Sequence, residues 1–337
     1  MATLRKLLVV CFGLIFASCF TFFFTSCAVK KGGENGEDEL SRWMKSFGQV
    51  KVCATTPLIA DTVRQIGGDH ISVISLMGPD IDPHSYEIVK GDHDKISHAD
   101  LVFANGLSLE HSRSMQRVLG EHKNVVFVSE RIPNNEIIIV DGSPDPHIWM
   151  DVELWSLTTF PIQAALSKID PKNAELYRER AEAVRVKYKL INEEIKARMQ
   201  SIPAARRRLV TSHDAFNYFA KQYLAKEGEW KSRVIAIQGL APEEQISSSE
   251  IKRVVDYVIN YNVKVIFAEK NLSRDSLLKV VDACRRSGQY VALAKEELFG
   301  DTMGKGSYIE MMEHNAKVIE LNLKYEDDPK ARPQIYS

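Results

Sequence analysis

Between Pro171 and Met199, apolar residues recur at alternating steps of four and three, with charged residues between them. The stripe consists of Tyr177, Ala181, Val184, Tyr188, Ile191 and Ile195. This spacing predicts one helix of roughly 29 residues, about 40 Å long, that buries a single face. It should end before Pro203, because proline cannot continue a helix without losing a hydrogen bond. Such a helix can pair with a second copy as a coiled coil or pack along its own chain, and we expect the second.

The long helix separates two series of alternating strand-like and helix-like segments. Before it, the expected strands are 50–54, 71–76, 101–104 and 125–128, and the expected helices are 57–66 and 110–119. After it, the expected strands are 209–211, 234–237, 263–268 and 290–293, and the expected helices are 215–224, 247–261, 274–287 and 307–323. This alternation is typical of parallel sheets covered by helices. We predict an α/β fold with two parallel-sheet lobes joined by a long rigid linker helix.

The N-terminus has the pattern of an export signal. Arg5 and Lys6 precede Leu7–Phe24, in which 15 of 18 residues are apolar. Cys27, after a small residue and before a polar tether, resembles the lipidated cysteine of bacterial lipoproteins, and Cys19 is its competitor. Simple cleavage of the leader and an uncleaved membrane anchor are the alternatives.

These patterns divide the chain into five parts. We expect an export signal (1–26), a flexible tether (27–48), an N-terminal metal-binding lobe (49–170), a linker helix (171–203) and a C-terminal metal-binding lobe (204–337).

Composition excludes several classes of protein. The 337 residues include 44 Lys and Arg against 45 Asp and Glu, a balance that argues against broad electrostatic binding to nucleic acid. Beyond the leader and Cys27 only Cys53 and Cys284 remain, and we expect two buried free thiols rather than a disulfide framework. Neither a phosphate-binding glycine loop nor the commonest hydrolase signatures occur.

The tripeptide Asp-Pro-His occurs twice, ending at His84 and at His147. Proline fixes its own φ and extends the residue before it, so each histidine should stand on a stiff loop. His213 directly follows the strand-like segment 209–211, where an open α/β lobe places its ligand crevice. The repeated motif and the post-strand histidine together favour a metal site that spans the two lobes. The other histidines are expected to be surface or hydrogen-bonded residues: His70, His93, His98, His111, His122 and His314.

Three sequence blocks carry a resemblance to a known family. They are residues 82–87, 144–151 and 212–219, with further likeness at 105–110 and 239–246. These blocks resemble the metal-specific solute-binding proteins of ABC importers, the TroA-like or ZnuA-like family, and within it the chlamydial YtgA branch. The likeness runs in the family's order from about Val50 to Val318.

The resemblance implies a metal ion in a cleft between the lobes. His84 and His147 would bind it from one lobe, and His213 and an aspartate from the other. By position that aspartate is Asp301, with Asp275 as the fallback. Three imidazoles and a carboxylate suit Zn²⁺, and Mn²⁺ or Fe²⁺ can also occupy such a set.

Further features of the sequence bear on the ligands and the cargo. Glu87, Glu110 and Asp151 lie beside the three blocks and are predicted to accept hydrogen bonds from the imidazole N–H groups. The chain lacks the His-rich loop of dedicated zinc carriers, and His213 stands where manganese carriers usually have Glu. The resemblance therefore leaves the choice among zinc, manganese and iron open.

The resemblance also implies a function. We expect a monomeric, non-enzymatic periplasmic protein, lipid-anchored if Cys27 is modified, that delivers its ion to a membrane permease with a cytoplasmic ATPase. An exported metal-containing adhesin and a zinc hydrolase are the alternatives. A hydrolase needs an open coordination position for an activated water.

Overall fold

The computed structural model describes residues 39–226, 228–242 and 246–324. The expected export signal, Cys19 and Cys27 lie outside the described residues. Within the described ranges, no helix combines the length and the apolarity that a membrane span requires.

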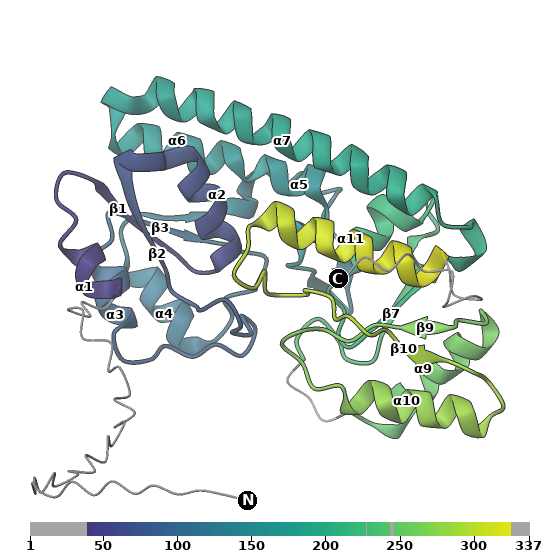
Figure 1. Ribbon diagram of the computed structural model, residues 1–337. Coiled ribbons are helices and arrows are strands. Elements are labelled where there is room, and N and C mark those ends of the chain that lie inside the picture. The colour runs from purple at the N-terminus through teal and green to yellow at the C-terminus, as the bar shows by residue number, and fades with distance from the viewer. Residues whose placement is uncertain (1–38, 227, 243–245, 325–337) are drawn as a thin grey trace, which may run out of the picture. The chain divides into compact units, whose positions relative to one another are not determined.

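A parallel four-stranded sheet, in the order β2-β1-β3-β4, forms the first lobe (Figure 1). Its strands are β1 (Val50–Ala54), β2 (Ile71–Ser75), β3 (Leu101–Ala104) and β4 (Val125–Phe127), and its helices are α2 (Pro57–Gly67), α3 (Asp92–Ser97) and α4 (Arg113–Glu121). Thr56 caps α2 by accepting from the Ile59 backbone N–H, and Pro57 occupies the first helical position. The predicted β-α order of this lobe is confirmed, and α3 is an addition to it.

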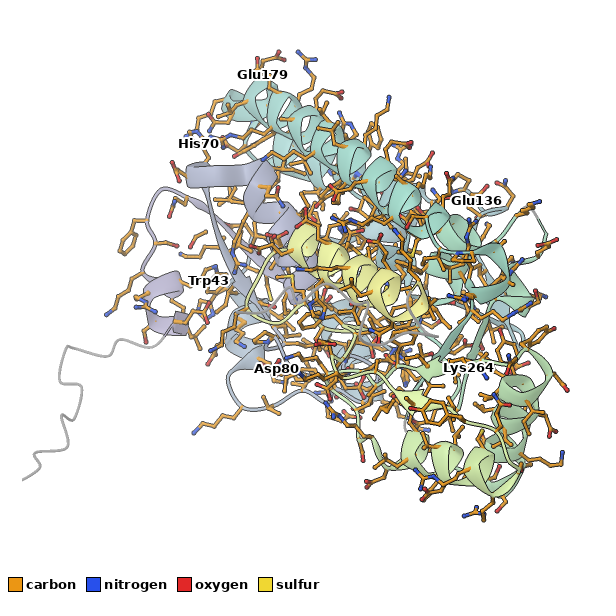
Figure 2. The ribbon with its side chains drawn as sticks, turned by 45° about the vertical axis from the view of Figure 1, so that its right-hand side comes forward. Trp43, His70, Asp80, Glu136, Glu179 and Lys264 are labelled. Carbon is orange, nitrogen blue, oxygen red and sulfur yellow. The ribbon has the colours of Figure 1, made fainter. Side chains whose placement is uncertain are left out.

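Residues 39–44, expected to be part of the tether, form the short helix α1 (Glu39–Met44). Its Trp43 is buried, and the indole Nε1–H donates to the Ser72 carbonyl oxygen of β2 at 2.9 Å (Figure 2). An indole ring buries a large apolar area, and Trp43 holds the segment against the sheet together with Leu40 and Met44, which pack against the same core.

The region between β4 and residue 170, for which the sequence indicated no elements, contains a hairpin and two helices. They are β5 (Ile139–Val140), β6 (Ser143–Pro144), α5 (Val152–Leu157) and α6 (Thr159–Ile169). Asp151 caps α5 by accepting from the backbone N–H groups of Glu153 and Leu154.

The second lobe contains two parallel strand pairs, β7 with β8 and β9 with β10. The elements are β7 (Leu209–Thr211), β8 (Val234–Ala236), β9 (Val265–Ile266), β10 (Ala292–Leu293), α8 (Asn217–Phe219), α9 (Ser248–Asn260), α10 (Asp275–Arg286) and α11 (Tyr308–Lys324). A π-helical turn, Ala220–Leu224, continues α8. The Phe267 N–H bonds to the Val210 carbonyl at 2.8 Å, which joins the β9 segment to β7. The strands β9 and β10 are shorter than the apolar runs predict.

The long helix α7 (Ala174–Gln200, 27 residues) joins the lobes, and its predicted apolar stripe is buried. It packs against α2, α5 and α6 of the first half of the chain and against α11 and the π-helical turn of the second half (Figure 1). A single buried cluster includes Val52 of β1, Tyr188 of α7 and Leu209 of β7, so one core runs through both lobes. Cys53 and Cys284 are buried and free, as expected.

Candidate metal centre

The two Asp-Pro-His motifs adopt the same local structure. In each, the backbone N–H of the histidine donates to Oδ1 of the aspartate two residues earlier, at 2.9 Å for His84 on Asp82 and 2.9 Å for His147 on Asp145. This is the turn in which an aspartate side chain bonds the backbone two residues on. The sequence repeat thus presents two imidazoles from two equally stiff turns.

His213 and Asp301 come from the second lobe. His213 follows β7, and Thr211 Oγ1 donates to its carbonyl oxygen at 3.0 Å. Asp301 lies in the loop between β10 and α11, where Asn315 of α11 bonds both backbone groups of Phe299. The Trp149 Nε1–H, two residues after His147, donates to the Gly300 carbonyl at 2.9 Å. The loop that carries Asp301 is therefore fastened to both halves of the chain.

The structure brings His84, His147, His213 and Asp301 together, each buried, with one ligand atom of each within 4.8 Å of all the others. The Nε2 atoms of His84 and His147 are 3.1 Å apart. Asp301 Oδ1 lies 3.2 Å from His147 Nε2 and 3.6 Å from His84 Nε2, and Asp301 Oδ2 lies 3.1 Å from His213 Nε2. Bonds of about 2.0–2.1 Å to a tetrahedral ion place its ligands about 3.3 Å apart, so the spacing fits one transition-metal ion.

Two carboxylates hold the imidazoles from behind. Asp145 Oδ1 lies 2.7 Å from His147 Nδ1, and Glu269 Oε2 lies 2.7 Å from His213 Nδ1. Because each carboxylate lies at Nδ1, the Nε2 atom of each histidine faces the centre. In metal sites an outer carboxylate in this position fixes the imidazole ring and raises its basicity. Glu269 also accepts the backbone N–H groups of Ser212 and His213 at 3.0 Å each.

The sequence contained signals for both carboxylates. Asp145 is the first residue of the second Asp-Pro-His motif, and Glu269 directly follows the apolar run 263–268. Neither carboxylate is among the predicted site residues.

Gly300 leaves room for Glu269. A Cβ atom at position 300 would lie 2.1 Å from Glu269 Oε2 and 3.0 Å from His213 Cε1. Any larger residue must displace the carboxylate or the imidazole.

The carboxylates change the acid–base behaviour of the metal-free centre. Burial alone would lower the pKa of His147, but Asp145 and Asp301 outweigh it and raise this pKa to about 9. The pKa of His213 rises well above its usual value because Asp301 and Glu269 outweigh burial in the same way. Burial would raise the pKa of Asp301, but His213 and His84 hold it well below its usual range. At neutral pH the centre holds protons that a metal ion must displace.

The three acidic residues predicted to bond the imidazoles have other partners. Glu87 accepts from the Ser114 hydroxyl, and Asp151 caps α5. Glu110 is buried and accepts from Thr55 Oγ1 and from the backbone N–H groups of residues 105 and 106. Two of these three donors are backbone groups of its own loop, 105–110, the third is the Thr55 hydroxyl, and none is an imidazole. The fallback ligand Asp275 is exposed at the start of α10.

Comparison with known proteins places these features in a family. The family model described as ZnuA, zinc-uptake complex component A, periplasmic, matches residues 52–321. The metal-binding protein YtgA of Chlamydia trachomatis is 35% identical over 324 residues, which cover 94% of this chain and 95% of YtgA. The manganese-binding lipoprotein MntA of Bacillus subtilis is 33% identical over 321 residues, 93% of this chain and 99% of MntA.

Solved structures agree with the sequence matches. Fe(III)-bound YtgA from Chlamydia trachomatis superposes with a TM-score of 0.78 and 36% identity, covering 82% of this chain and 98% of that structure. The periplasmic zinc-binding protein TroA of Treponema pallidum superposes with a TM-score of 0.75 and 31% identity, covering 82% and 99%. The resemblance found in the sequence and the two-lobed α/β fold are thereby confirmed.

Proposed function

This chain belongs to the ZnuA family of metal-binding solute-binding proteins, and on that premise we propose that it captures a transition-metal ion and delivers it to an ABC-type permease. Relatives are named for zinc, manganese or iron. The observation that carries the proposal is the convergence of His84, His147, His213 and Asp301 on one buried point. We assign these four residues as the ligands of the transported ion.

The donor set bears on the reaction and on the cargo. Four protein ligands complete a tetrahedral sphere and leave no position for an activated water, which argues for a carrier rather than a zinc hydrolase. Three imidazoles and one carboxylate bind Zn²⁺ more tightly than Fe²⁺ or Mn²⁺, following the general affinity order of divalent ions. The supply of each metal then decides which ion is transported.

We further propose that the protein is exported, works as a monomer outside the cytoplasm, and is held at a membrane when Cys27 is lipidated. Relatives named as ABC-transporter substrate-binding lipoproteins support a permease, its ATPase and an anchor as the partners. We propose two lobes, 49–170 and 204–337, with 171–203 as the linker.

Calorimetric titration of the metal-stripped protein with Zn²⁺, Mn²⁺ and anaerobic Fe²⁺ tests the proposal. We expect tight one-to-one binding for at least one ion and a large loss of affinity in His213→Ala. His93→Ala, which removes an exposed histidine of α3, is the matched control and should bind as the parent does. Substoichiometric or multi-site binding of all three ions would refute the carrier function and favour an adhesin with incidental metal.

A further inference from the structure

Asn217 contacts the centre indirectly, through Asp145. Asn217 is 3% exposed, and its side-chain Nδ2 donates to Asp145 Oδ2 at 3.0 Å. The other carboxylate oxygen, Oδ1, accepts from both His147 Nδ1 and the His147 backbone N–H. A chain of hydrogen bonds therefore runs from Asn217 through one carboxylate to His147.

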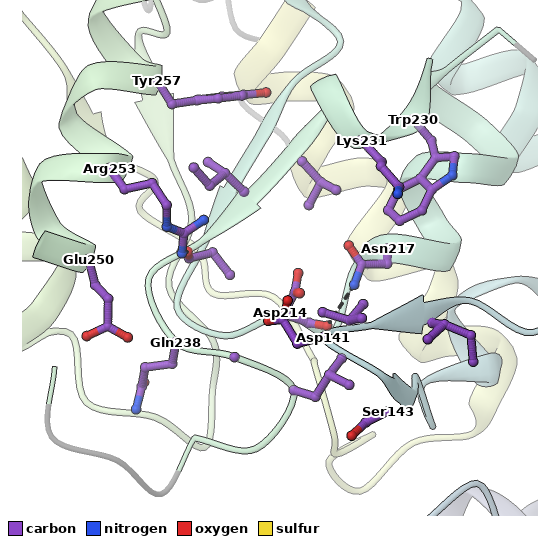
Figure 3. A pocket seen from close by; sticks show the side chains of 17 residues that line it. Asp141, Ser143, Asp214, Asn217, Trp230, Lys231, Gln238, Glu250, Arg253 and Tyr257 are labelled. Atoms are coloured by element: carbon purple, nitrogen blue, oxygen red, sulfur yellow. Dashed lines mark hydrogen bonds between the residues drawn. The ribbon is translucent and has the colours of Figure 1, made fainter. Parts of the chain in front are cut away.

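The amide of Asn217 is fixed in this orientation. A carboxylate only accepts, so the amide nitrogen must face Asp145. The same nitrogen also approaches the Asp214 carbonyl oxygen, at 3.4 Å, as the dashed line in Figure 3 shows. The neighbouring residue Tyr218 donates its hydroxyl to the Asp145 carbonyl at 3.0 Å and accepts from the Ile138 N–H. Two consecutive residues of α8 thus fix the side chain and the backbone of Asp145.

This contact crosses between the halves of the chain on either side of α7. Asp145 follows the hairpin β5–β6, and Asn217 begins α8 in the second half. Asp145 has no exposed surface, and a buried carboxylate needs hydrogen-bond donors at both oxygens. Without Asn217, the described donors to this carboxylate are the Nδ1 and the backbone N–H of His147, both on Oδ1, and Oδ2 has no described donor to hold it.

A cavity of about 820 Å³ lies on the other side of Asn217. Hairpin residues such as Asp141 and Ser143 form one wall, and β8 with Arg253 of α9 forms the opposite wall (Figure 3). Asn217 and Asp214 line it as well, whereas Asp145 does not. The amide of Asn217 therefore stands between a cavity large enough for water and a buried carboxylate–imidazole pair. Water that reached this pair would raise the local dielectric and weaken the hydrogen bond.

We infer that Asn217 is a positioning residue for the transported ion. From the opposite half of the chain it fixes the Asp145 carboxylate and shields it from water, and so it holds His147 in place for metal retention. The inference rests on the proposed function and deepens it. The Asn217–Asp145 hydrogen bond joins the two halves of the chain. If the halves separate at this point, the bond is lost and His147 loses the support of a fixed Asp145 carboxylate.

The test is a double-mutant cycle on metal retention. Asn217→Ala should raise the Zn²⁺ dissociation rate about tenfold, measured by transfer to an excess of a chromophoric chelator. This is the lower end of the loss of affinity that follows removal of a partner bonded directly to a ligand. The visible spectrum of the Co²⁺-loaded variant should change, because a displaced His147 alters the coordination geometry. In an Asp145→Asn background the same substitution should add little, since the carboxylate on which Asn217 acts is already gone.

Lys221→Met is the matched control. Lys221 lies one helical turn after Asn217 and also bonds a residue of the first half of the chain, since its Nζ is 2.8 Å from Oε2 of Glu136 (labelled in Figure 2). The Lys221–Glu136 pair includes none of the four assigned metal ligands. It should keep the parent's dissociation rate and Co²⁺ spectrum. Asn217→Asp, which has the same size, gives the measurement if Asn217→Ala does not fold, and should also release Zn²⁺ faster because it places two carboxyl groups together.

The outcomes separate the two proposals. A parent protein that binds no metal would overturn the proposed function and this inference with it. If the parent binds and the Asn217 variants release Zn²⁺ at the parent's rate, the inference alone is wrong. It is also wrong if Lys221→Met releases the ion as fast as Asn217→Ala, or if Asn217→Ala has its full effect in the Asp145→Asn background.

Discussion

Replacing Glu269 with glutamine isolates the contribution of one outer carboxylate to metal binding. In the parent, Glu269 Oε1 accepts the N–H groups of Ser212 and His213, while Oε2 lies 2.7 Å from His213 Nδ1. The glutamine carbonyl can still accept both backbone bonds, so the turn after β7 should persist. Its amide nitrogen, however, takes the place of Oε2. The amide N–H and the His213 Nδ1–H are both donors, so the bond between the two side chains is lost.

The expected loss follows from this geometry. Outer carboxylate partners of metal-binding histidines typically contribute 10–100-fold in affinity, which corresponds to about 1.4–2.7 kcal/mol. We expect the Glu269→Gln loss toward the upper end, because both residues are fully buried and no solvent screens their interaction.

The assay is competition between the protein and a chelator of known affinity for Zn²⁺, with unfolding in urea measured on the same samples. Glu110→Gln is the matched control: Glu110 is also buried and also accepts two backbone N–H bonds, from residues 105 and 106, but it bonds none of the site imidazoles in the described structure. This control should lower the free energy of unfolding and leave metal affinity unchanged. Parental affinity in Glu269→Gln, or an equal loss in both variants, would refute the reasoning.

Three further predictions concern the same centre. The raised pKa of His147 should stabilise the metal-free fold fully below about pH 6.5, and this stabilisation should be lost as the pH rises through about 9, whereas Zn²⁺ affinity should increase over the same interval. Urea unfolding of the metal-free protein and calorimetric titration with Zn²⁺, each at pH 6.5 and 9.5, check the two opposite trends. Gly300→Ala places a Cβ 2.1 Å from Glu269 Oε2 and should cost about 1–3 kcal/mol of stability and weaken Zn²⁺ binding, while the control Gly120→Ala, whose Cβ meets nothing within 4 Å, should do neither. Unfolding in urea and calorimetric titration measure the two effects, and parental Zn²⁺ binding in Gly300→Ala would contradict the steric argument. Trp149→Phe removes the hydrogen bond to the Gly300 carbonyl and should lower the free energy of unfolding by about 1 kcal/mol and speed Zn²⁺ release. Stopped-flow capture of the ion by a chelator measures the release rate, and an unchanged rate would mean that this bond does not hold the Asp301 loop.

Features that depend on neighbours along the chain could be predicted from the sequence alone. The apolar stripe from Tyr177 to Ile195 predicts α7, because helical periodicity places those residues on one face whatever they pack against. The two Asp-Pro-His motifs predict two stiff turns, since the aspartate, the fixed proline and the histidine N–H all lie within three residues. The strands of both lobes follow from the same kind of short-range signal, whereas α3, the hairpin β5–β6 and the helices α5 and α6 were not predicted.

Which side chains meet at the centre depends on the packing of elements that are distant in the sequence. Glu110 and Asp151 lie near the motifs in sequence, yet local backbone N–H groups bind them, while Glu269 reaches His213 from 56 residues away. Asp301 joins the centre because Trp149 and Asn315 fix its loop, whereas Asp275 stays at the surface. The physical reason is that a buried carboxylate is stabilised by whichever donors the packing of distant elements brings within bonding distance, and no spacing along one segment specifies those donors.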